Sequence, residues 1–212
     1  MLKVNEIFHS IQGESTRAGL PCVFVRLTGC NLRCSWCDTV YAFHEGRSMS
    51  VDEVLEAVAR YDCRLVELTG GEPLLQDEAI PLMQQLLARG YGVLLETGGH
   101  LPIDRVPDGV TRVVDIKCPG SGEVENNHWD NLPLLDRGDE IKFVLRDRAD
   151  YDWAVEQLRA RELASRCPVL FSPVHGVLDP GELSRWVLDD GLAVRVQIQL
   201  HKTLWPGVLR GV

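Results

Sequence analysis

CVFVRLTGCNLRCSWC, residues Cys22–Cys37, joins an apolar run to a loop that contains three cysteines. The first six residues, Cys22–Leu27, are mostly β-branched, aromatic or aliphatic and predict a buried strand. The loop that follows spaces Cys30, Cys34 and Cys37 as CxxxCxxC. Parallel α/β folds bind ligands at the carboxyl ends of their strands. The loop is therefore a candidate functional site.

Strand-like runs alternate with helix-like runs along the chain, a pattern typical of βα units around a mainly parallel sheet. Further strands are expected at residues 65–68, 93–95, 113–116, 141–145, 169–171 and 194–200. Helices are expected from residue 50, at 80–89, at 151–163 and from residue 179. Eight complete βα units usually need about 250 residues, and the chain has 212. We therefore expect an α/β fold, an incomplete (βα) barrel of about six parallel strands in a single domain, residues 1–212.

Local signals mark where two helices begin and one ends. Ser50-Val51-Asp52-Glu53 forms a capping box. The apolar residues that follow it share one helix face: Val51, Val54, Leu55, Val58 and Ala59. Asp179, followed by proline and then glutamate at the third position, predicts another helix start. Gly90 is placed to end the second helix in a left-handed conformation.

Composition excludes several classes of protein. The formal net charge of −9 argues against broad nucleic-acid binding through neutralised phosphates. No apolar run approaches the roughly 20 residues of a membrane helix. The amino terminus lacks the apolar stretch of a secretory signal. We expect a cytoplasmic protein that binds neither membranes nor nucleic acid.

The chain has seven cysteines, an odd number with uneven spacing. Cys22, Cys63, Cys118 and Cys167 are scattered, and we expect them to be small buried hydrophobes. The three clustered cysteines point instead to metal binding or catalysis in a reducing compartment.

The cysteine loop has two metal interpretations. Three thiolates would leave one iron of a 4Fe–4S cluster without a protein ligand and open to a small chelating molecule. A structural zinc ion needs four ligands. His44 is the nearest candidate for a fourth, and no second ligand pair is evident. The loop by itself favours the cluster and leaves zinc open.

The loop has Trp36 directly before its third cysteine, and it resembles the signature of the radical S-adenosylmethionine enzymes. A second motif, Thr69-Gly70-Gly71-Glu72-Pro73, follows the next strand and resembles the GGEP motif of that superfamily. The resemblance implies a 4Fe–4S cluster held by the three loop cysteines, with S-adenosylmethionine on the open iron. An electron from the cluster then generates a 5′-deoxyadenosyl radical, which abstracts a hydrogen atom from substrate.

The whole chain, from the segment Glu6–Glu14 to Arg210-Gly211-Val212, resembles the 7-carboxy-7-deazaguanine synthase family of queuosine biosynthesis. The resemblance implies a homodimeric lyase that converts 6-carboxy-5,6,7,8-tetrahydropterin to 7-carboxy-7-deazaguanine with loss of ammonia. It also implies a magnesium ion and an electron donor such as flavodoxin or ferredoxin.

The same resemblance implies the site residues. The cluster would bind Cys30, Cys34 and Cys37, and magnesium would bind Thr39. S-adenosylmethionine would contact Trp36, Cys37, Asp38, Gly70, Gly71, Glu72, Gly99, Lys117, Ser172 and His175. The substrate would contact Ile11, Gln12, Gly13, Glu14, Arg26, Thr97, His201 and the terminal carboxylate of Val212. No side chain is expected to be catalytic, because the cofactor radical performs the hydrogen abstraction. Arginine can clamp a carboxylate, and glutamine and glutamate can complement a pterin edge.

Two alternative functions remain. A glycyl-radical activating enzyme also has a short chain and a CxxxCxxC loop, but it would need a groove for a partner polypeptide. A zinc-stabilised binding module without catalysis is the second alternative.

Overall fold

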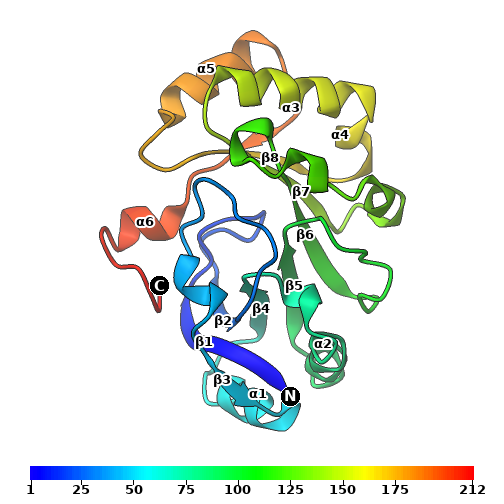
Figure 1. Cartoon of the computed structure of the whole chain (residues 1–212), viewed down its shortest axis with the longest axis vertical. Helices are drawn as coiled ribbons and strands as arrows, with labels where there is room; N and C mark the ends of the chain where they lie inside the picture. The colour runs from blue at the N-terminus through cyan, green and yellow to red at the C-terminus, as the bar shows by residue number, and fades with distance from the viewer.

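The computed structural model describes all 212 residues and contains one nine-stranded sheet, in the order β3-β1-β2-β4-β5-β6-β7-β8-β9 (Figure 1). The strands are β1 (Leu2–Ile11), β2 (Pro21–Leu27), β3 (Arg47–Met49), β4 (Leu65–Gly70), β5 (Gly92–Thr97), β6 (Val110–Ile116), β7 (Glu140–Leu145), β8 (Val169–Pro173) and β9 (Arg195–Val196). Neighbouring strands from β2 through β4 to β9 pair in parallel. β1 and β3 extend the sheet in antiparallel fashion beyond β2. The open α/β barrel is confirmed, with seven parallel strands and an antiparallel pair that the sequence analysis missed.

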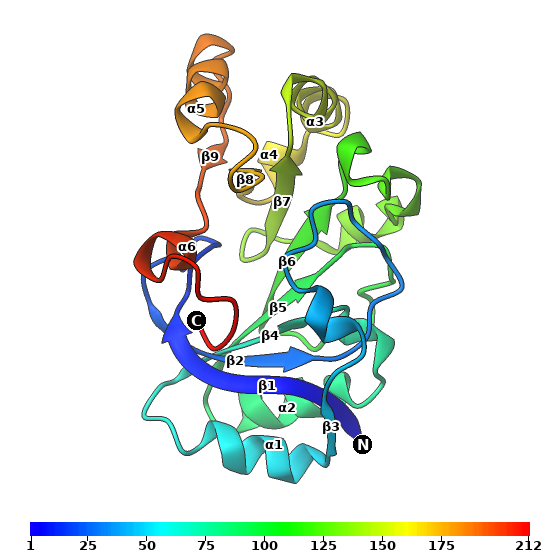
Figure 2. The same ribbon diagram turned by 60° about the vertical axis from the view of Figure 1, so that its left-hand side comes forward.

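Six α-helices connect and flank the strands. They are α1 (Val51–Val58), α2 (Ala79–Ala88), α3 (Arg148–Ala160), α4 (Leu163–Arg166), α5 (Pro180–Asp189) and α6 (Leu200–Leu204). Short 3-10 helices are η1 (Val40–Phe43), η2 (Pro73–Leu75), η3 (Pro119–Ser121), η4 (Val124–Asn126) and η5 (Trp129–Leu134). Helices α2, α3 and α5 pack against β5, β7 and β8. Figure 2 shows α6 and the C-terminal tail on the opposite side of the curved sheet from α1 and α2.

The capping signals work as expected. The Ser50 hydroxyl accepts a hydrogen bond from the Glu53 N–H at 3.2 Å, and the Glu53 carboxylate accepts one from the Ser50 N–H at 2.6 Å. The Asp179 carboxylate accepts from the Glu182 N–H at 2.8 Å. Gly90 has a φ of +77°. One detail was wrong: Ala59 is the C-cap of α1 and is exposed, so it does not belong to the buried face of the helix.

Several expected boundaries differ from those of the structure: β4, β5, β6 and β8 are each longer by two to three residues, and the largest differences are at α3 and at the last strand. Helix α3 begins at Arg148, three residues early, because Asp147 caps it, and Glu162 in the left-handed region separates it from α4. The strand expected at 194–200 is wrong beyond Arg195–Val196. The Leu200 N–H instead donates to the Gly13 carbonyl at 2.9 Å, so the chain leaves the sheet and begins α6 beside the end of β1.

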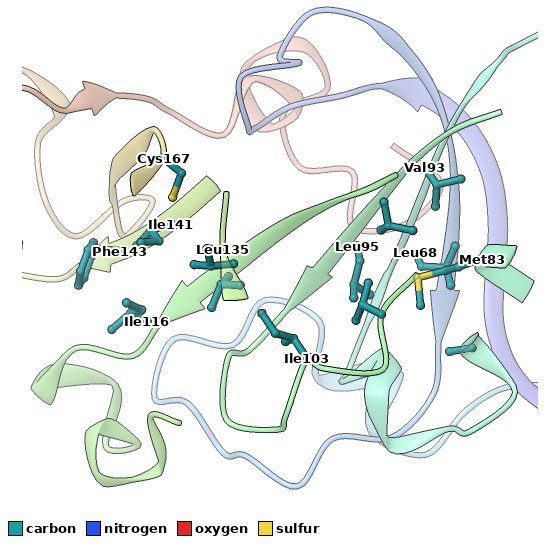
Figure 3. Packing of buried hydrophobic residues seen from close by; sticks show 14 of the residues in the cluster. Leu68, Met83, Val93, Leu95, Ile103, Ile116, Leu135, Ile141, Phe143 and Cys167 are labelled. Atoms are coloured by element: carbon teal, nitrogen blue, oxygen red, sulfur yellow. The ribbon is translucent and has the colours of Figure 1, made fainter. Parts of the chain in front are cut away.

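The hydrophobic core lies between the sheet and the helices (Figure 3). Alternate residues of the strands enter it, for example Leu68 from β4, Leu95 from β5 and Phe143 from β7. Cys22, Cys63, Cys118 and Cys167 are buried free thiols, as expected. No helix has both the length and the apolar character that crossing a membrane requires.

Candidate active site

A cavity of about 580 Å³ opens inside the barrel, where the carboxyl ends of the parallel strands meet. Its lining includes every residue that the sequence analysis placed in the site except Gly99. Gly99 lies just behind the lining, where its carbonyl accepts hydrogen bonds from the N–H of His128 and the side chain of Asn131. The segments at the two ends of the chain and the central motifs therefore meet in one place.

The inner face of the sheet carries the charge. Because side chains alternate along a strand, the residues next to those in the core point into the cavity. They are Glu67 and Thr69 on β4, Glu96 on β5, Asp115 on β6, and Lys142 and Val144 on β7. The sequence analysis did not select these residues. A signal was present, since charged residues within strands buried on both faces are unusual and need a partner or a function.

The three loop cysteines all line this cavity as free, half-buried thiols. Burial raises the pKa of Cys34 to about 11 and also raises that of Cys30, so cluster assembly must release protons from them. No three His, Cys, Asp or Glu side chains converge on a point where one ion could bind. A structural zinc ion needs such convergence, whereas the thiolates of a 4Fe–4S cluster each bind a different iron. The donor set fits the cluster.

The glycines of the second motif bring it against the cysteine loop. The Gly71 N–H donates to the Leu27 carbonyl, and the Glu72 N–H donates to the Gly29 carbonyl at 2.7 Å. A Cβ on Gly71 would overlap the carbonyl oxygen of Gly29 and stand 3.1 Å from the Cβ of Cys30. The two motifs pack backbone to backbone, which only glycine permits at this distance.

The Glu72 carboxylate is fully buried beneath the cavity wall and is occupied by protein donors. It accepts hydrogen bonds from the Thr97 hydroxyl at 2.9 Å and from the N–H groups of Leu74 and Gly98. The imidazole of His100 lies 3.7 Å away and also contacts Asn31 of the cysteine loop at 2.6 Å. Glu72 thus joins the loop after β5 to the second motif, and its contact with a cofactor stays a prediction, as does that of Thr97 with substrate.

Two buried polar atoms of the lining have no partner in the protein. They are the Ser172 hydroxyl and one carboxylate oxygen of Asp115. The other Asp115 oxygen pairs with the Lys117 ammonium at 2.7 Å. Buried polar groups are nearly always hydrogen-bonded, so these two atoms are suited to a polar ligand in this part of the cavity.

Arg26 lies on β2 with its guanidinium facing the cavity. Its Nε donates to the Glu6 carboxylate at 2.8 Å, and its plane lies over the rings of Phe8 and Tyr41. The two terminal nitrogens make no hydrogen bond within the protein. A guanidinium fixed at Nε in this way presents its remaining donors to a carboxylate.

Helix α6 packs closely against Gly13 at the edge of the cavity. A Cβ on Gly13 would overlap the His201 imidazole and stand 3.0 Å from the His201 backbone nitrogen. Beyond α6, the tail is held by a two-fold contact between Arg210 and Glu45, at 2.7 and 3.0 Å. The Gly211 N–H also donates to Glu6 at 3.2 Å. These contacts bring Val212 into the cavity lining.

Thr39 and Asp38 follow the last loop cysteine. The Thr39 hydroxyl lies 3.8 Å from the Cys37 sulfur and lines the cavity. Asp38 pairs with Lys202 of α6 at 2.6 Å and accepts a hydrogen bond from Gln199. The sequence analysis did not anticipate Gln199 or Lys202 in the site, because it expected a strand at 194–200 that runs into a tail, where the structure has the start of α6.

The sequence and the fold are similar to those of known proteins. Residues 24–113 match the Radical SAM superfamily. Two curated relatives named 7-carboxy-7-deazaguanine synthase are each 47% identical to the chain. The alignment with the relative from Koribacter versatilis covers the full length of both chains. The alignment with the relative from Chlorobaculum tepidum covers 100% of this chain and 97% of the relative. The crystal structure of QueE from Escherichia coli superimposes with a TM-score of 0.77, covers 94% of each chain and is 24% identical, which shows a shared fold.

Proposed function

The chain belongs to the 7-carboxy-7-deazaguanine synthase family of radical S-adenosylmethionine enzymes, and we propose how its cavity carries out that activity. The enzyme is a lyase of 7-deazapurine biosynthesis, which converts 6-carboxy-5,6,7,8-tetrahydropterin to 7-carboxy-7-deazaguanine and ammonia. One observation carries the assignment beyond family membership: the three free cysteines and the polar residues suited to a carboxypterin line the same cavity.

Cys30, Cys34 and Cys37 hold the 4Fe–4S cluster that the superfamily uses with S-adenosylmethionine. Together these two groups supply the radical that abstracts hydrogen. Around them, we assign S-adenosylmethionine to Trp36, Asp38, Gly70, Gly71, Lys117, Ser172 and His175, which line the cavity. The unpartnered Ser172 hydroxyl supports this assignment, because a polar ligand would satisfy it.

The substrate occupies the end of the cavity lined by the residues after β1 and by the C-terminal tail. Arg26 receives the substrate carboxylate through its two free nitrogens, since Glu6 holds only Nε. Gln12, Glu14, His201 and the Val212 carboxylate receive the polar edge of the pterin.

We also assign a magnesium ion to Thr39. Its hydroxyl faces the cavity, and magnesium accepts few protein ligands when water and substrate oxygens complete its octahedron. The neighbouring Asp38 carboxylate is already paired with Lys202, so the substrate carboxylate is the natural second ligand.

Three properties of the whole protein complete the proposal. The chain forms one domain, because a single sheet runs through it. It assembles as a homodimer, whose interface would cover exposed apolar residues such as Leu204, Val208 and Leu209. A flavodoxin or ferredoxin delivers the electron at the cysteine loop, where Asn31, Arg33 and Ser35 are exposed. Seven free cysteines suit the reducing cytoplasm.

A glycyl-radical activating enzyme is not favoured. The full-length relatives carry the synthase name. In addition, the C-terminal tail runs along the cavity and contacts Glu6 and Glu45, where a polypeptide substrate would need open space.

The test is anaerobic reconstitution with iron, sulfide, S-adenosylmethionine, dithionite, magnesium and 6-carboxy-5,6,7,8-tetrahydropterin. We expect mass spectrometry to detect 7-carboxy-7-deazaguanine and 5′-deoxyadenosine. Cys34→Ala should lose the brown chromophore and both products. Cys63→Ala is the matched control, because this cysteine is buried in the core away from the cavity. An active, colourless Cys34→Ala variant would contradict the cluster assignment.

A further inference from the structure

A buried cation lies on the inner face of β7. The Lys142 ammonium is 2.6 Å from a carboxylate oxygen of Glu14 and also contacts a carboxylate oxygen of Glu96. Its side chain is only 6% exposed. Lys142 is thus enclosed between a loop residue near the start of the chain and a residue of β5, 128 and 46 positions away.

The contact extends through the residues assigned to the substrate. The other Glu14 oxygen accepts a hydrogen bond from Gln199 at 2.7 Å. The Glu14 N–H donates to the Gln12 side-chain carbonyl at 3.1 Å, and the Gln12 amide donates to the buried Glu67 carboxylate. Lys142 therefore holds one end of a continuous chain of hydrogen bonds that passes through Gln12 and Glu14.

Lys142 is the cation available to these carboxylates. The other cations of the lining are engaged elsewhere: Arg26 with Glu6, Lys117 with Asp115, and Lys202 with Asp38. Without Lys142, the buried carboxyl group of Glu67 and the half-buried ones of Glu14 and Glu96 would lie close together with no directly paired cation, and neighbouring like charges in such a site do not all stay ionised.

The charge states agree with this geometry. Burial pushes the pKa of Glu96 up, but Lys142, together with the more distant Lys117 and Arg26, brings it below its ordinary value. Burial and the Glu96 carboxylate raise the pKa of Glu67, so Glu67 binds a proton more readily than Glu96 does. The pKa of Lys142 itself is raised, because Glu14 and Glu96 overcome the effect of its burial.

We propose that Lys142 is a positioning residue, which holds the carboxylates of Glu14 and Glu96 directed into the cavity so that they receive the N–H donors of the pterin substrate. The proposal rests on the function proposed above. The 2-amino-4-oxo edge of a pterin presents adjacent N–H groups, and an ionised carboxylate accepts them far better than a protonated one. Lys142 therefore determines substrate affinity without touching the reacting carbon.

The test compares Lys142→Met with Lys142→Arg and with the exposed-lysine control Lys3→Met in the reconstituted enzyme. Lys142→Met keeps the aliphatic length and removes the charge. We expect its kcat/KM to fall by about 100-fold, mainly through KM, the size expected for losing one charge-assisted hydrogen bond. Lys142→Arg should recover kcat/KM to within about tenfold of the wild type, because it restores the cation. Lys3→Met should match the wild type.

A second comparison separates positioning from general damage. If Lys142 acts through Glu14, the double variant Glu14→Gln/Lys142→Met should be scarcely worse than either single variant, since both remove the same interaction. Independent effects that multiply would overturn the proposal, as would a Lys142→Met enzyme with a wild-type KM. Should Lys142→Met fail to fold, Glu96→Gln decides: a KM raised about tenfold supports the proposal and an unchanged KM overturns it.

These outcomes are distinguishable from failure of the proposed function. If the wild-type enzyme makes no 7-carboxy-7-deazaguanine, the function itself is refuted. If it does, and Lys142→Met retains iron, sulfide and the wild-type KM, only the role of Lys142 is refuted.

Discussion

Gly13→Ala should disable the enzyme while leaving its fold nearly intact. The new Cβ would overlap the His201 imidazole and stand 3.0 Å from the His201 backbone nitrogen. Ordinary carbon contacts begin at about 3.5 Å, so the start of α6 must move by roughly half an ångström to 1 Å. This helix carries His201 and Lys202, and Gln199 lies at its N-terminal end.

The expected cost is large for activity and small for stability. A misplacement of about 1 Å in a site can reduce the rate about 100-fold. Helix α6 buries no residue, and the displaced Leu200–Gly13 hydrogen bond contributes about 1 kcal/mol to stability. For a protein of this size, that lowers Tm by about 2–4 °C.

The assay is steady-state formation of 7-carboxy-7-deazaguanine under anaerobic conditions, together with a thermal melt. Gly92→Ala is the matched control, because a Cβ there makes only ordinary contacts, with a leucine methyl group at 3.5 Å and a backbone oxygen at 3.8 Å, and should leave both values unchanged. A Gly13→Ala enzyme with wild-type kcat/KM would show that His201 and α6 do not form part of the site. A fall in Tm far beyond 4 °C would show that α6 contributes to the core.

Three further predictions concern the metal, the tail and pH. Thr39→Ala should weaken the dependence of rate on magnesium, and an unchanged magnesium titration would reject the assigned ligand. Deleting Gly211 and Val212 should slow turnover severely with full iron and sulfide content, and normal kinetics would remove the tail from the site. Burial lowers the pKa of His100 to about 4 in the folded protein. Between pH 6.5 and 4, His100 therefore binds a proton in the unfolded chain but not in the folded one. The free energy of unfolding should fall by up to about 3 kcal/mol as the pH falls through this range. His100→Gln should flatten this part of a urea-unfolding profile, and an unchanged slope would contradict the neutral imidazole.

Local sequence signals predicted much of the fold because they act over a few residues. The cap at Ser50, the turn at Gly90 and the apolar runs of β2 and β4 each depend on neighbours within one turn or strand. β1 was missed for a physical reason. Its register shifts between Val4 and Glu6, and this irregularity interrupts the alternation that marks a strand.

The sequence by itself indicated the chemistry: a spacing of cysteines, a glycine motif and a full-length resemblance named 20 of the 36 residues that line the cavity. Only the tertiary structure decided how those residues pair. Lys142 reaches Glu14 across 128 positions, and Gly211 reaches Glu6 across 205. Such pairs depend on strand order and on the return of the C-terminal tail to the first strands. Local composition does not reveal these pairs, because a charged residue within an apolar strand, such as Lys142, shows that a partner is needed but not which residue it is.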